Sequence, residues 1–220
     1  MAEINFLEKL HGSTSRNYLE RVCEDDKAAC AVIAKQWGKE YWDGDRCYGY
    51  GGYRYDGRWR TLAEAMANHY QLQAGDRVLD VGCGKAFLLY ELTQVVPGID
   101  VTGIDISDYA LANTKSEMHP VVKKADAVAL PFADDSFDLV YSLTTLHNLY
   151  NYHLYQALGE IERVGCGNAY VCVESYRNEQ EKANLLYWQL TCESFYTPDE
   201  WEWFFTMAGY SGDWGYIFFE

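Results

Sequence analysis

The sequence predicts an α/β domain in which helices cover both faces of a doubly wound, mostly parallel sheet. From residue 77 onward, short apolar runs typical of buried strands alternate strictly with longer segments of helical spacing. Several of these runs end at glycine or aspartate, as RVLDVG at 77–82 does. A length of 220 residues suits one domain with a sizeable core.

The N-terminal part predicts helices that flank an aromatic segment. Apolar residues recur at helical spacing over 17–37, so we expect a helix there, with Ser13 or Ser15 as its cap. The segment 41–59, YWDGDRCYGYGGYRYDGRW, mixes aromatic rings with glycines and has little aliphatic bulk. Another helix is expected over 62–72.

The alternation defines the remaining elements. The expected strands are 77–84, 101–105, 121–126, 137–143, 168–175 and 213–220. The helices expected between them are 85–95, 107–118, 154–163, 178–192 and 197–208. The last helix begins with Thr-Pro-Asp-Glu, which is typical of a helix start.

Composition excludes several classes of partner. Eighteen basic and 33 acidic side chains give a net charge of −15, which disfavours nucleic acid because a phosphate backbone needs a basic footprint. No segment approaches the roughly 18 uninterrupted apolar residues of a membrane helix, and the start lacks a secretory signal. Seven cysteines form no C-x-x-C pair, so we expect reduced thiols in a cytoplasmic protein and no metal site.

The first strand end carries a glycine pair. In the run DVGCGKAF, Gly82 and Gly84 allow a tight turn that brings backbone N–H groups close to a ligand. A nicotinamide dinucleotide site would need a third glycine where Phe87 stands. A phosphate-binding P-loop is also excluded, because Lys85 is not followed by Ser or Thr.

Acidic residues follow the next two strands. Asp105 stands 21 positions after Gly84, where a carboxylate suits a pair of ribose hydroxyls. A surface acid that caps a helix is the alternative. Asp126 ends the third strand and could accept a hydrogen bond from an exocyclic amine.

Residues from about 75 to 164 resemble the class I S-adenosylmethionine-dependent methyltransferases, particularly the small-molecule group related to ubiquinone and menaquinone methyltransferases. The resemblance rests on VLDVGCG, GIDIS, the Asp126-Ala127 pair and LPFADDSFDLVYSLTTLHNL. It implies a Rossmann-like sheet of the seven-stranded type, closed by an antiparallel pair after the fifth strand. Only GYSGDWGYIFFE remains for that pair, so the C-terminal antiparallel hairpin must be short or one strand is missing.

The resemblance also implies how the methionine part of the cofactor is held. Gly82 and Gly84 would line it, and Asp80 would lie beneath it and help to hold the amino group. The family often has glycine where this chain has Ala86, which is a mild departure.

The adenosine part would be held by the following strand ends. The resemblance implies that Asp105 takes both ribose hydroxyls, with Ile106 against the adenine face. Asp126 would accept from the adenine amino group, and Ala127 would offer its backbone N–H to the ring. Ser142 would supply backbone contacts near the sulfonium.

Methyl transfer from a sulfonium is an in-line displacement in which the protein mainly positions the reactants. A general base helps when the acceptor is a hydroxyl or an ammonium. His147, in the loop after the fourth strand, is the first candidate for that base, and a structural histidine is the alternative. Glu174, at the end of the fifth strand, is the second candidate.

The segment 41–59 has three interpretations: a lid over the site, a packed layer or a linker. The density of rings argues against a disordered linker. In this fold the segment before the first strand commonly packs over the cofactor, so a lid is favoured. Its glycines would form the hinge, and its contact surface would be Tyr48, Tyr50, Tyr53 and Tyr55.

Together these observations predict one domain, with residues 1–60 as a cap and 61–220 as the methyltransferase part. We expect transfer of a methyl group from S-adenosylmethionine to an O or N atom of a small polar metabolite, with S-adenosylhomocysteine as product. Aromatic rings mixed with acids would suit an amine-bearing acceptor or a sugar. The alternatives are aminopropyl transfer and a catalytically inactive protein with this fold.

Overall fold

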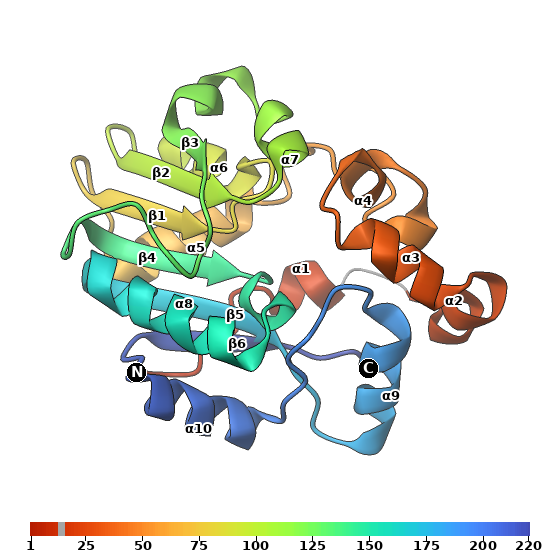
Figure 1. The fold of residues 1–220 in the computed structure, drawn as a ribbon. Helices are drawn as coiled ribbons and strands as arrows, with labels where there is room; N and C mark the ends of the chain where they lie inside the picture. Colours follow the sequence, from red (N-terminus) through yellow and green to blue (C-terminus); the bar gives the residue numbers. More distant parts are fainter. Residues whose placement is uncertain (13–15) are drawn as a thin grey trace.

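The structure is a computed structural model that describes residues 1–12 and 16–220. Within these residues, six strands form one sheet in the order β3-β2-β1-β4-β5-β6, and all neighbours are parallel (Figure 1). The strands are β1 (Arg77–Val81), β2 (Asp100–Asp105), β3 (Val122–Lys124), β4 (Phe137–Leu143), β5 (Gly165–Glu174) and β6 (Asp213–Ile217). The predicted parallel, doubly wound α/β fold is confirmed.

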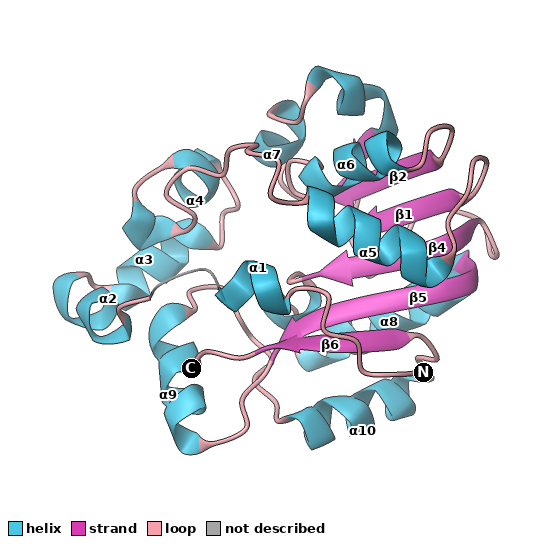
Figure 2. Ribbon diagram, turned by 180° about the vertical axis from the view of Figure 1, so that it is seen from behind, coloured by secondary structure: helices cyan, strands magenta, loops and turns pink. Residues whose placement is uncertain are grey.

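Helices cover both faces of this sheet and create two apolar cores (Figure 2). Helices α5 (Arg60–Tyr70) and α6 (Phe87–Val95) pack on one face. Helices α8 (Asn151–Val164) and α10 (Pro198–Ala208) pack on the other, around the fully buried Trp201. Because both faces are covered, the strands can be apolar throughout, as the sequence predicts.

The expected C-terminal antiparallel hairpin is wrong. Among the described residues, one strand follows α10, and it pairs with β5 in parallel, with Tyr170 opposite Asp213. The reason is the connection, because a helical crossover returns the chain to the same end of the sheet and so makes the next strand parallel. The sheet therefore has six strands where the family resemblance implies seven.

The chain start protects the outer edge of β6. The backbone N–H of Ile4 donates to the carbonyl of Trp214 (2.6 Å), and the N–H of Trp214 donates to the carbonyl of Ala2 (3.0 Å). These bonds use groups that an edge strand would otherwise expose to pairing with another chain. The N-terminal residues are thus tied to the C-terminal strand.

The single helix expected over 17–37 is two helices, α2 (Tyr18–Glu24) and α3 (Lys27–Ala34). The break lies at Asp26, whose side chain accepts from the backbone N–H groups of Ala28 and Ala29 and so caps α3. The apolar spacing continues through the break, which is why the pattern alone predicts one helix.

The cap expected at Ser13 or Ser15 lies outside the described residues. The observed cap of α2 is Asn17, whose side chain accepts from the N–H of Glu20 (3.2 Å). The other elements of the N-terminal part are α1 (Glu8–Gly12), α4 (Lys39–Asp43) and the 3₁₀ turn η1 (Arg46–Tyr48).

Two further helices are shorter than expected. The segment 107–118 forms α7 (Asp108–Ala112) and then the 3₁₀ helix η2 (Ser116–Val121), which contains Pro120. Proline lacks a donor and disfavours α geometry in the residue before it, so an α-helix cannot continue there. Helix α9 (Glu179–Trp188) also ends before the predicted residue 192. Of the helices formed by residues 1–12 and 16–220, none is long and apolar enough to cross a membrane.

Candidate active site

A cavity of about 590 Å³ lies at the carboxyl ends of the strands, beneath the N-terminal helices. Its floor is formed by residues that follow β1, β2, β3, β4 and β5. This is the place at which open parallel sheets bind ligands. The volume falls in the range of roughly 300–1,000 Å³ that is typical of small-molecule sites.

The glycine turn after β1 has the conformation that its sequence predicts. Gly82 and Gly84 have φ of +87° and +53°, and the N–H groups of Gly82 and Cys83 donate to the carbonyl of Ile104. Ala86, which starts α6, also has a left-handed φ of +56°. An alanine there carries a strain of about 1–2 kcal/mol, which explains why glycine is common at this position in the family.

Asp105 is fixed at the end of β2 by two backbone donors. Its carboxylate accepts from the N–H of Gly84 and from the N–H of Ser107, each at 2.8 Å. Burial raises the pKa of this carboxyl. The next residue, Ile106, lines the cavity with a side chain that is 45% exposed. An oriented carboxylate beside an exposed apolar side chain matches the ribose and adenine of the expected cofactor.

Asp126 and Ala127 line the same part of the cavity. Asp126 is exposed, and its side chain accepts from the N–H of Val128 (3.1 Å). Ala127 is buried. The structure thus brings together the four residues expected around the adenosine: Asp105, Ile106, Asp126 and Ala127.

Ser142 takes a different position from the one expected. Its fully buried hydroxyl donates to the carbonyl of Val81 (2.7 Å), and it does not line the cavity. Thr144 and Thr145, further along the chain, do. A Cβ on Gly82 would lie 2.2 Å from the Thr145 hydroxyl, so this glycine is needed for the close approach of the loop after β4.

Asp80 supplies a test of whether the expected cofactor fits. The side chain is 4% exposed, and its Oδ1 has no hydrogen-bond partner among the described residues. Burial raises the pKa of Asp80 to about 8. A buried carboxyl that lines the cavity, and whose polar neighbour in the protein is the Tyr141 hydroxyl, suits an ammonium group such as that of the methionine moiety.

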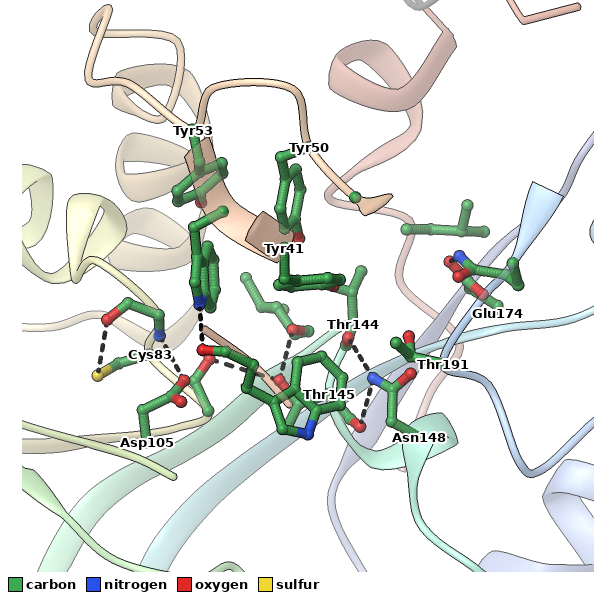
Figure 3. A pocket seen from close by; sticks show the side chains of 18 of the residues that line it. Tyr41, Tyr50, Tyr53, Cys83, Asp105, Thr144, Thr145, Asn148, Glu174 and Thr191 are labelled. Carbon is green, nitrogen blue, oxygen red and sulfur yellow. Dashed lines mark hydrogen bonds between the residues drawn. The ribbon is translucent and has the colours of Figure 1, made fainter. Parts of the chain in front are cut away.

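The aromatic segment forms the wall opposite the strand ends. In Figure 3, Tyr41, Tyr50 and Tyr53 lie across the cavity from Asp105 and the loop after β4. The ring of Trp42 stacks on Tyr50 at 5.4 Å, and its opposite edge covers the glycine turn. Residues 41–53 are therefore packed, and the linker interpretation is excluded for them.

The four tyrosines expected at the substrate divide into two pairs. Tyr50 and Tyr53 line the cavity, whereas Tyr48 and Tyr55 do not. The hydroxyl of Tyr55 donates to Glu91 of α6 (2.6 Å), so this ring holds the segment to the helix. Sequence spacing could not separate the pairs, because the segment has no regular period.

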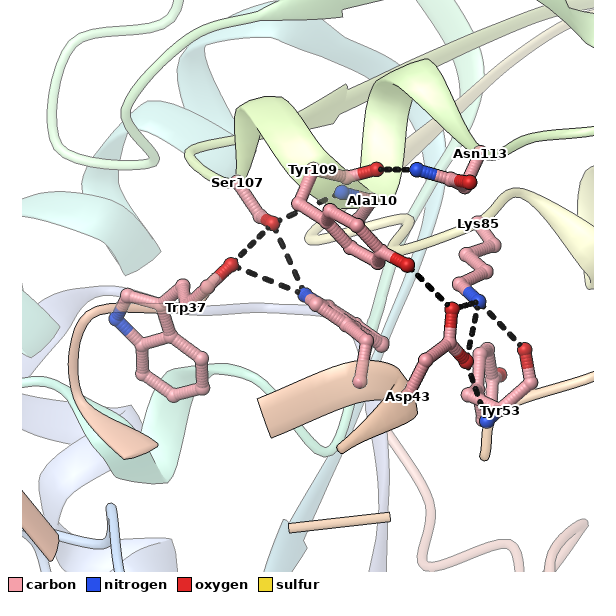
Figure 4. Close-up of polar contacts among 9 residues, drawn as sticks. Trp37, Asp43, Tyr53, Lys85, Ser107, Tyr109, Ala110 and Asn113 are labelled. Atoms are coloured by element: carbon pink, nitrogen blue, oxygen red, sulfur yellow. Dashed lines mark hydrogen bonds and ion pairs between the residues drawn. The ribbon is translucent and has the colours of Figure 1, made fainter. Parts of the chain in front are cut away.

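A buried ion pair fastens the aromatic segment to the glycine turn (Figure 4). The ammonium of Lys85 lies 2.6 Å from Asp43 and also donates to the carbonyl of Tyr53 (2.8 Å). Asp43 further accepts from the hydroxyl of Tyr109 of α7 (2.8 Å). The side chain of Lys85 is only 5% exposed and that of Asp43 is 23% exposed, so the ammonium is shielded from solvent and the carboxylate only partly.

A second fastening lies nearby. The indole N–H of Trp42 donates to the hydroxyl of Ser107 (2.9 Å), which also caps α7 through the N–H of Ala110. The same hydroxyl donates to the carbonyl of Trp37 (2.5 Å). The aromatic segment is thus bonded to the start of α6 and of α7, on both sides of Asp105.

His147 and Glu174 lie together, but only Glu174 lines the cavity. His147 is in the 3₁₀ turn η3 (Leu146–Asn148), is 2% exposed, and accepts at Nδ1 from the N–H of Glu174 (3.3 Å). Its Nε2 lies 3.5 Å from Oε2 of Glu174. Burial lowers the pKa of His147 to about 3. The ring therefore lies behind the carboxyl and does not face the cavity, contrary to the expectation from its loop.

Glu174 is the titratable group at the acceptor end of the cavity. Burial raises its pKa to about 8, although the amide of Gln189 donates to Oε1. Its Oε2 has no hydrogen-bond partner in the described part of the chain. This oxygen is itself buried, but the residue lines the cavity, and a carboxyl with an unpaired oxygen can take a proton from a ligand that reaches it.

Several lining residues were not predicted from the sequence. They come from segments distant in the chain: Arg16, Arg21, Trp42, Arg46, Trp188 and Gln189. Their spacing carries no motif, and nothing local indicates that α2 and α9 meet at the mouth of the cavity. Of these residues, Trp42 was the most open to prediction, because it directly precedes Asp43, the acid that pairs with Lys85.

Comparison with known proteins agrees with this geometry. Residues 79–173 match the family described as "Methyltransferase domain". The 27-O-demethylrifamycin SV methyltransferase of Amycolatopsis mediterranei is 28% identical over 146 residues, which cover 61% of this chain and 51% of that protein. The demethylmenaquinone methyltransferase of Thermus thermophilus is 36% identical over 114 residues, 50% of each chain. This chain thus spans about half the length of these relatives.

Solved structures show the same fold. A Haloferax volcanii protein solved in complex with the methyltransferase activator Trm112 has a TM-score of 0.56 and 23% identity, over 84% of this chain and 76% of that one. The YcgJ protein of Bacillus subtilis has a TM-score of 0.53 and 21% identity, over 66% of each chain. Residues 79–173 thus match a methyltransferase domain, as the sequence motifs predict, and the sheet has the fold of these solved structures.

Asp80 makes cofactor binding depend on pH. With a pKa of about 8, it is mostly protonated at pH 7 in the free protein, whereas holding an ammonium requires the carboxylate. Binding of S-adenosylhomocysteine should therefore release close to one proton at pH 7 and almost none well above pH 8, and should tighten as the pH rises to about 8. Calorimetry in buffers of different ionisation enthalpy measures this number.

The matched control is Asp80→Asn, which should bind more weakly and release no proton from this site. Wild-type protein that binds the ligand at pH 7 without releasing a proton would show that Asp80 does not hold the amino group.

Proposed function

We propose that this chain transfers a methyl group from S-adenosylmethionine to an O or N atom of a small polar metabolite. The observation that carries the proposal is one cavity with two chemically different ends. One end has the glycine turn, Asp80 and Asp105 with its exposed neighbour Ile106, and the other has Glu174, whose buried Oε2 has no hydrogen-bond partner among the described residues. Such an arrangement suits a nucleoside cofactor at the first end and, at the second, an acceptor that loses a proton when it is methylated.

The residues that would hold the cofactor divide by its parts. Asp80 and the turn of Gly82 and Gly84 would hold the methionine moiety. Asp105 would take the ribose hydroxyls, because each of its oxygens keeps a lone pair beyond its one backbone bond. At the base, Ile106, Asp126 and Ala127 would contact the adenine. When bound, S-adenosylmethionine supplies an electrophilic methyl group.

Glu174 would take the proton of the acceptor. Oε2 of Glu174 would accept the proton that the acceptor O or N gives up when it is methylated. His147 is a positioning residue in this scheme, because its Nδ1 holds the Glu174 backbone and its ring excludes water behind the carboxyl. The tyrosine wall would keep water from the reacting atoms.

The alternatives have less support. Aminopropyl transfer calls for carboxylates that bind a polyamine, and the loop after β4 presents Thr144, Thr145 and Asn148 to the cavity. For an inactive protein there would be no reason to keep Asp105 oriented by two backbone bonds. We also propose that the protein acts in the cytoplasm, since its seven cysteines are free thiols, as a reducing compartment would keep them.

The function is tested by binding and turnover together. At a concentration about 100 times its dissociation constant, S-adenosylhomocysteine should stabilise the protein by about 2.7 kcal/mol. Asp105→Ala should weaken binding about 10–100-fold, because a charged acceptor of two hydroxyls is lost. Asp100→Ala, at the exposed opposite end of the same strand, is the matched control and should bind normally.

Turnover is measured as S-adenosylhomocysteine released from S-adenosylmethionine across pools of small metabolites. A protein that neither is stabilised by the product nor releases it with any pool would contradict the proposed function.

The role of Glu174 is tested by its pH dependence. Because its pKa is about 8 in the free protein, the fraction that can accept a proton rises as the pH passes through that value, so turnover should rise as well. Glu174→Gln should lower kcat about 10²–10⁴-fold and abolish this rise. His147→Asn should keep the rise and lose less activity.

Turnover of Glu174→Gln within about threefold of wild type, with the rise intact, would remove Glu174 from the reaction. Proximity would then be the main catalytic contribution.

A further inference from the structure

Three arginines gather around one tryptophan at the acceptor end of the cavity. The guanidinium carbons of Arg16, Arg21 and Arg46 lie 5.5, 4.9 and 5.0 Å from the ring centre of Trp188. All four residues line the cavity. Because each guanidinium is this close to the same ring centre, any two of them are no more than about 11 Å apart.

This concentration of positive charge runs against the composition of the chain, whose net charge is −15. Five other arginines each form an ion pair with a carboxylate: Arg58, Arg60, Arg77, Arg163 and Arg177. Within residues 1–12 and 16–220, by contrast, no carboxylate forms an ion pair with Arg21, Arg46 or Arg54, and all three line the cavity. Despite its excess of acids, the chain thus leaves cations at this cavity for a ligand.

The guanidiniums of Arg21 and Arg46 are oriented by backbone carbonyls. Arg21 donates from Nε to the carbonyl of Trp188 (2.8 Å) and from Nη1 to the carbonyl of Arg46 (3.0 Å). Arg46 donates from Nη1 to the carbonyls of Gly49 and Tyr50 (2.8 and 2.9 Å). Neutral carbonyls fix the geometry without cancelling the charge. Among residues 1–12 and 16–220, no group accepts a hydrogen bond from Nη2 of Arg21 or Arg46, so these groups can serve a ligand.

The arginines repel one another at this separation. Burial, and then the charge of Arg46, lowers the pKa of Arg21. Over distances close to the Debye length of about 8 Å at physiological ionic strength, such repulsion is only partly screened. A bound oxyanion would relieve it, and arginine forks match carboxylate and phosphate groups in two-point contacts.

We infer that the acceptor carries an oxyanion, a carboxylate or a phosphate group, which Arg21, Arg46 and Arg16 bind beside Trp188. This inference rests on the proposed function and names the substrate class for the same site. Asp80, Asp105 and Asp126 then lie at the cofactor end, and the arginines lie at the acceptor end together with Glu174, which interacts electrostatically with Arg16. An anionic acceptor differs from the amine-bearing one expected from the aromatic rings mixed with acids.

The test uses the full chain saturated with S-adenosylhomocysteine, so that the cofactor end is filled. Inorganic phosphate and sodium acetate are titrated at constant ionic strength, with chloride as the balancing salt, and the melting temperature is recorded. Both oxyanions, or one of them, should raise the melting temperature of the wild type. A larger shift with phosphate indicates a phosphate group on the acceptor, and a larger shift with acetate indicates a carboxylate.

Arg21→Gln and Arg46→Gln should each weaken the apparent affinity for the oxyanion about tenfold or more, because a charged donor pair is lost. Binding of S-adenosylhomocysteine should persist in both, which shows that they fold. Arg58→Gln is the matched control, since Arg58 lines the same cavity but pairs with Asp56, and its affinity for the oxyanion should stay within about twofold of wild type.

Failure of this inference differs from failure of the proposed function. If S-adenosylhomocysteine binds but neither oxyanion shifts the wild type, or if both arginine variants respond as the wild type does, the anionic acceptor is overturned and the methyltransferase remains. If S-adenosylhomocysteine itself does not bind, the proposed function fails.

Discussion

The buried ion pair between Lys85 and Asp43 is the contact on which the rest of the site depends. Lys85 directly follows the glycine turn, and Asp43 lies in the aromatic segment more than 40 residues earlier in the chain. Removing Asp43 would be costly, because it would leave the buried Lys85 ammonium without its carboxylate. The pair therefore helps to hold the tyrosine wall against the strand ends, so that the wall covers the cavity.

The cover that the tyrosine wall forms over the strand ends explains the raised pKa of two carboxyls in the cavity. With the wall in place, Asp80 and Glu174 are both buried, and burial raises the pKa of each to about 8. An exposed carboxyl would titrate near 4 and would be neither a selective ammonium site nor a useful base at neutral pH. At the far end of the cavity α2 and α9 meet, where Arg21 donates to the carbonyl of Trp188. The aromatic segment contributes Arg46 to that end, whereas the acids of the cavity come from the strand ends.

The features that the sequence predicts correctly are those that depend on residues adjacent in the chain. The strand expected at 137–143 coincides with β4, and the left-handed turn at Gly82 and Gly84 is as predicted, because both depend on adjacent residues. The side on which His147 lies was not predictable, since a single short 3₁₀ turn decides it. The parallel direction of β6 and the arginine cluster depend on contacts between distant segments, which leave no pattern in the sequence. Whether the aromatic segment moves as a lid stays a prediction.

Amide hydrogen exchange over residues 41–59 tests most directly whether this segment is a fastened wall. The N–H of Tyr53 donates to the carbonyl of Trp42 (2.9 Å) and to Asp43 (3.0 Å), and the N–H of Tyr50 donates to the carbonyl of Tyr41 (2.9 Å). These amides should exchange slowly in the free protein, and at least about tenfold faster in Asp43→Ala, while the amides of β1 stay protected in both. Exchange at the rate of an unstructured peptide in the free wild type, with protection only after S-adenosylhomocysteine is added, would contradict the account.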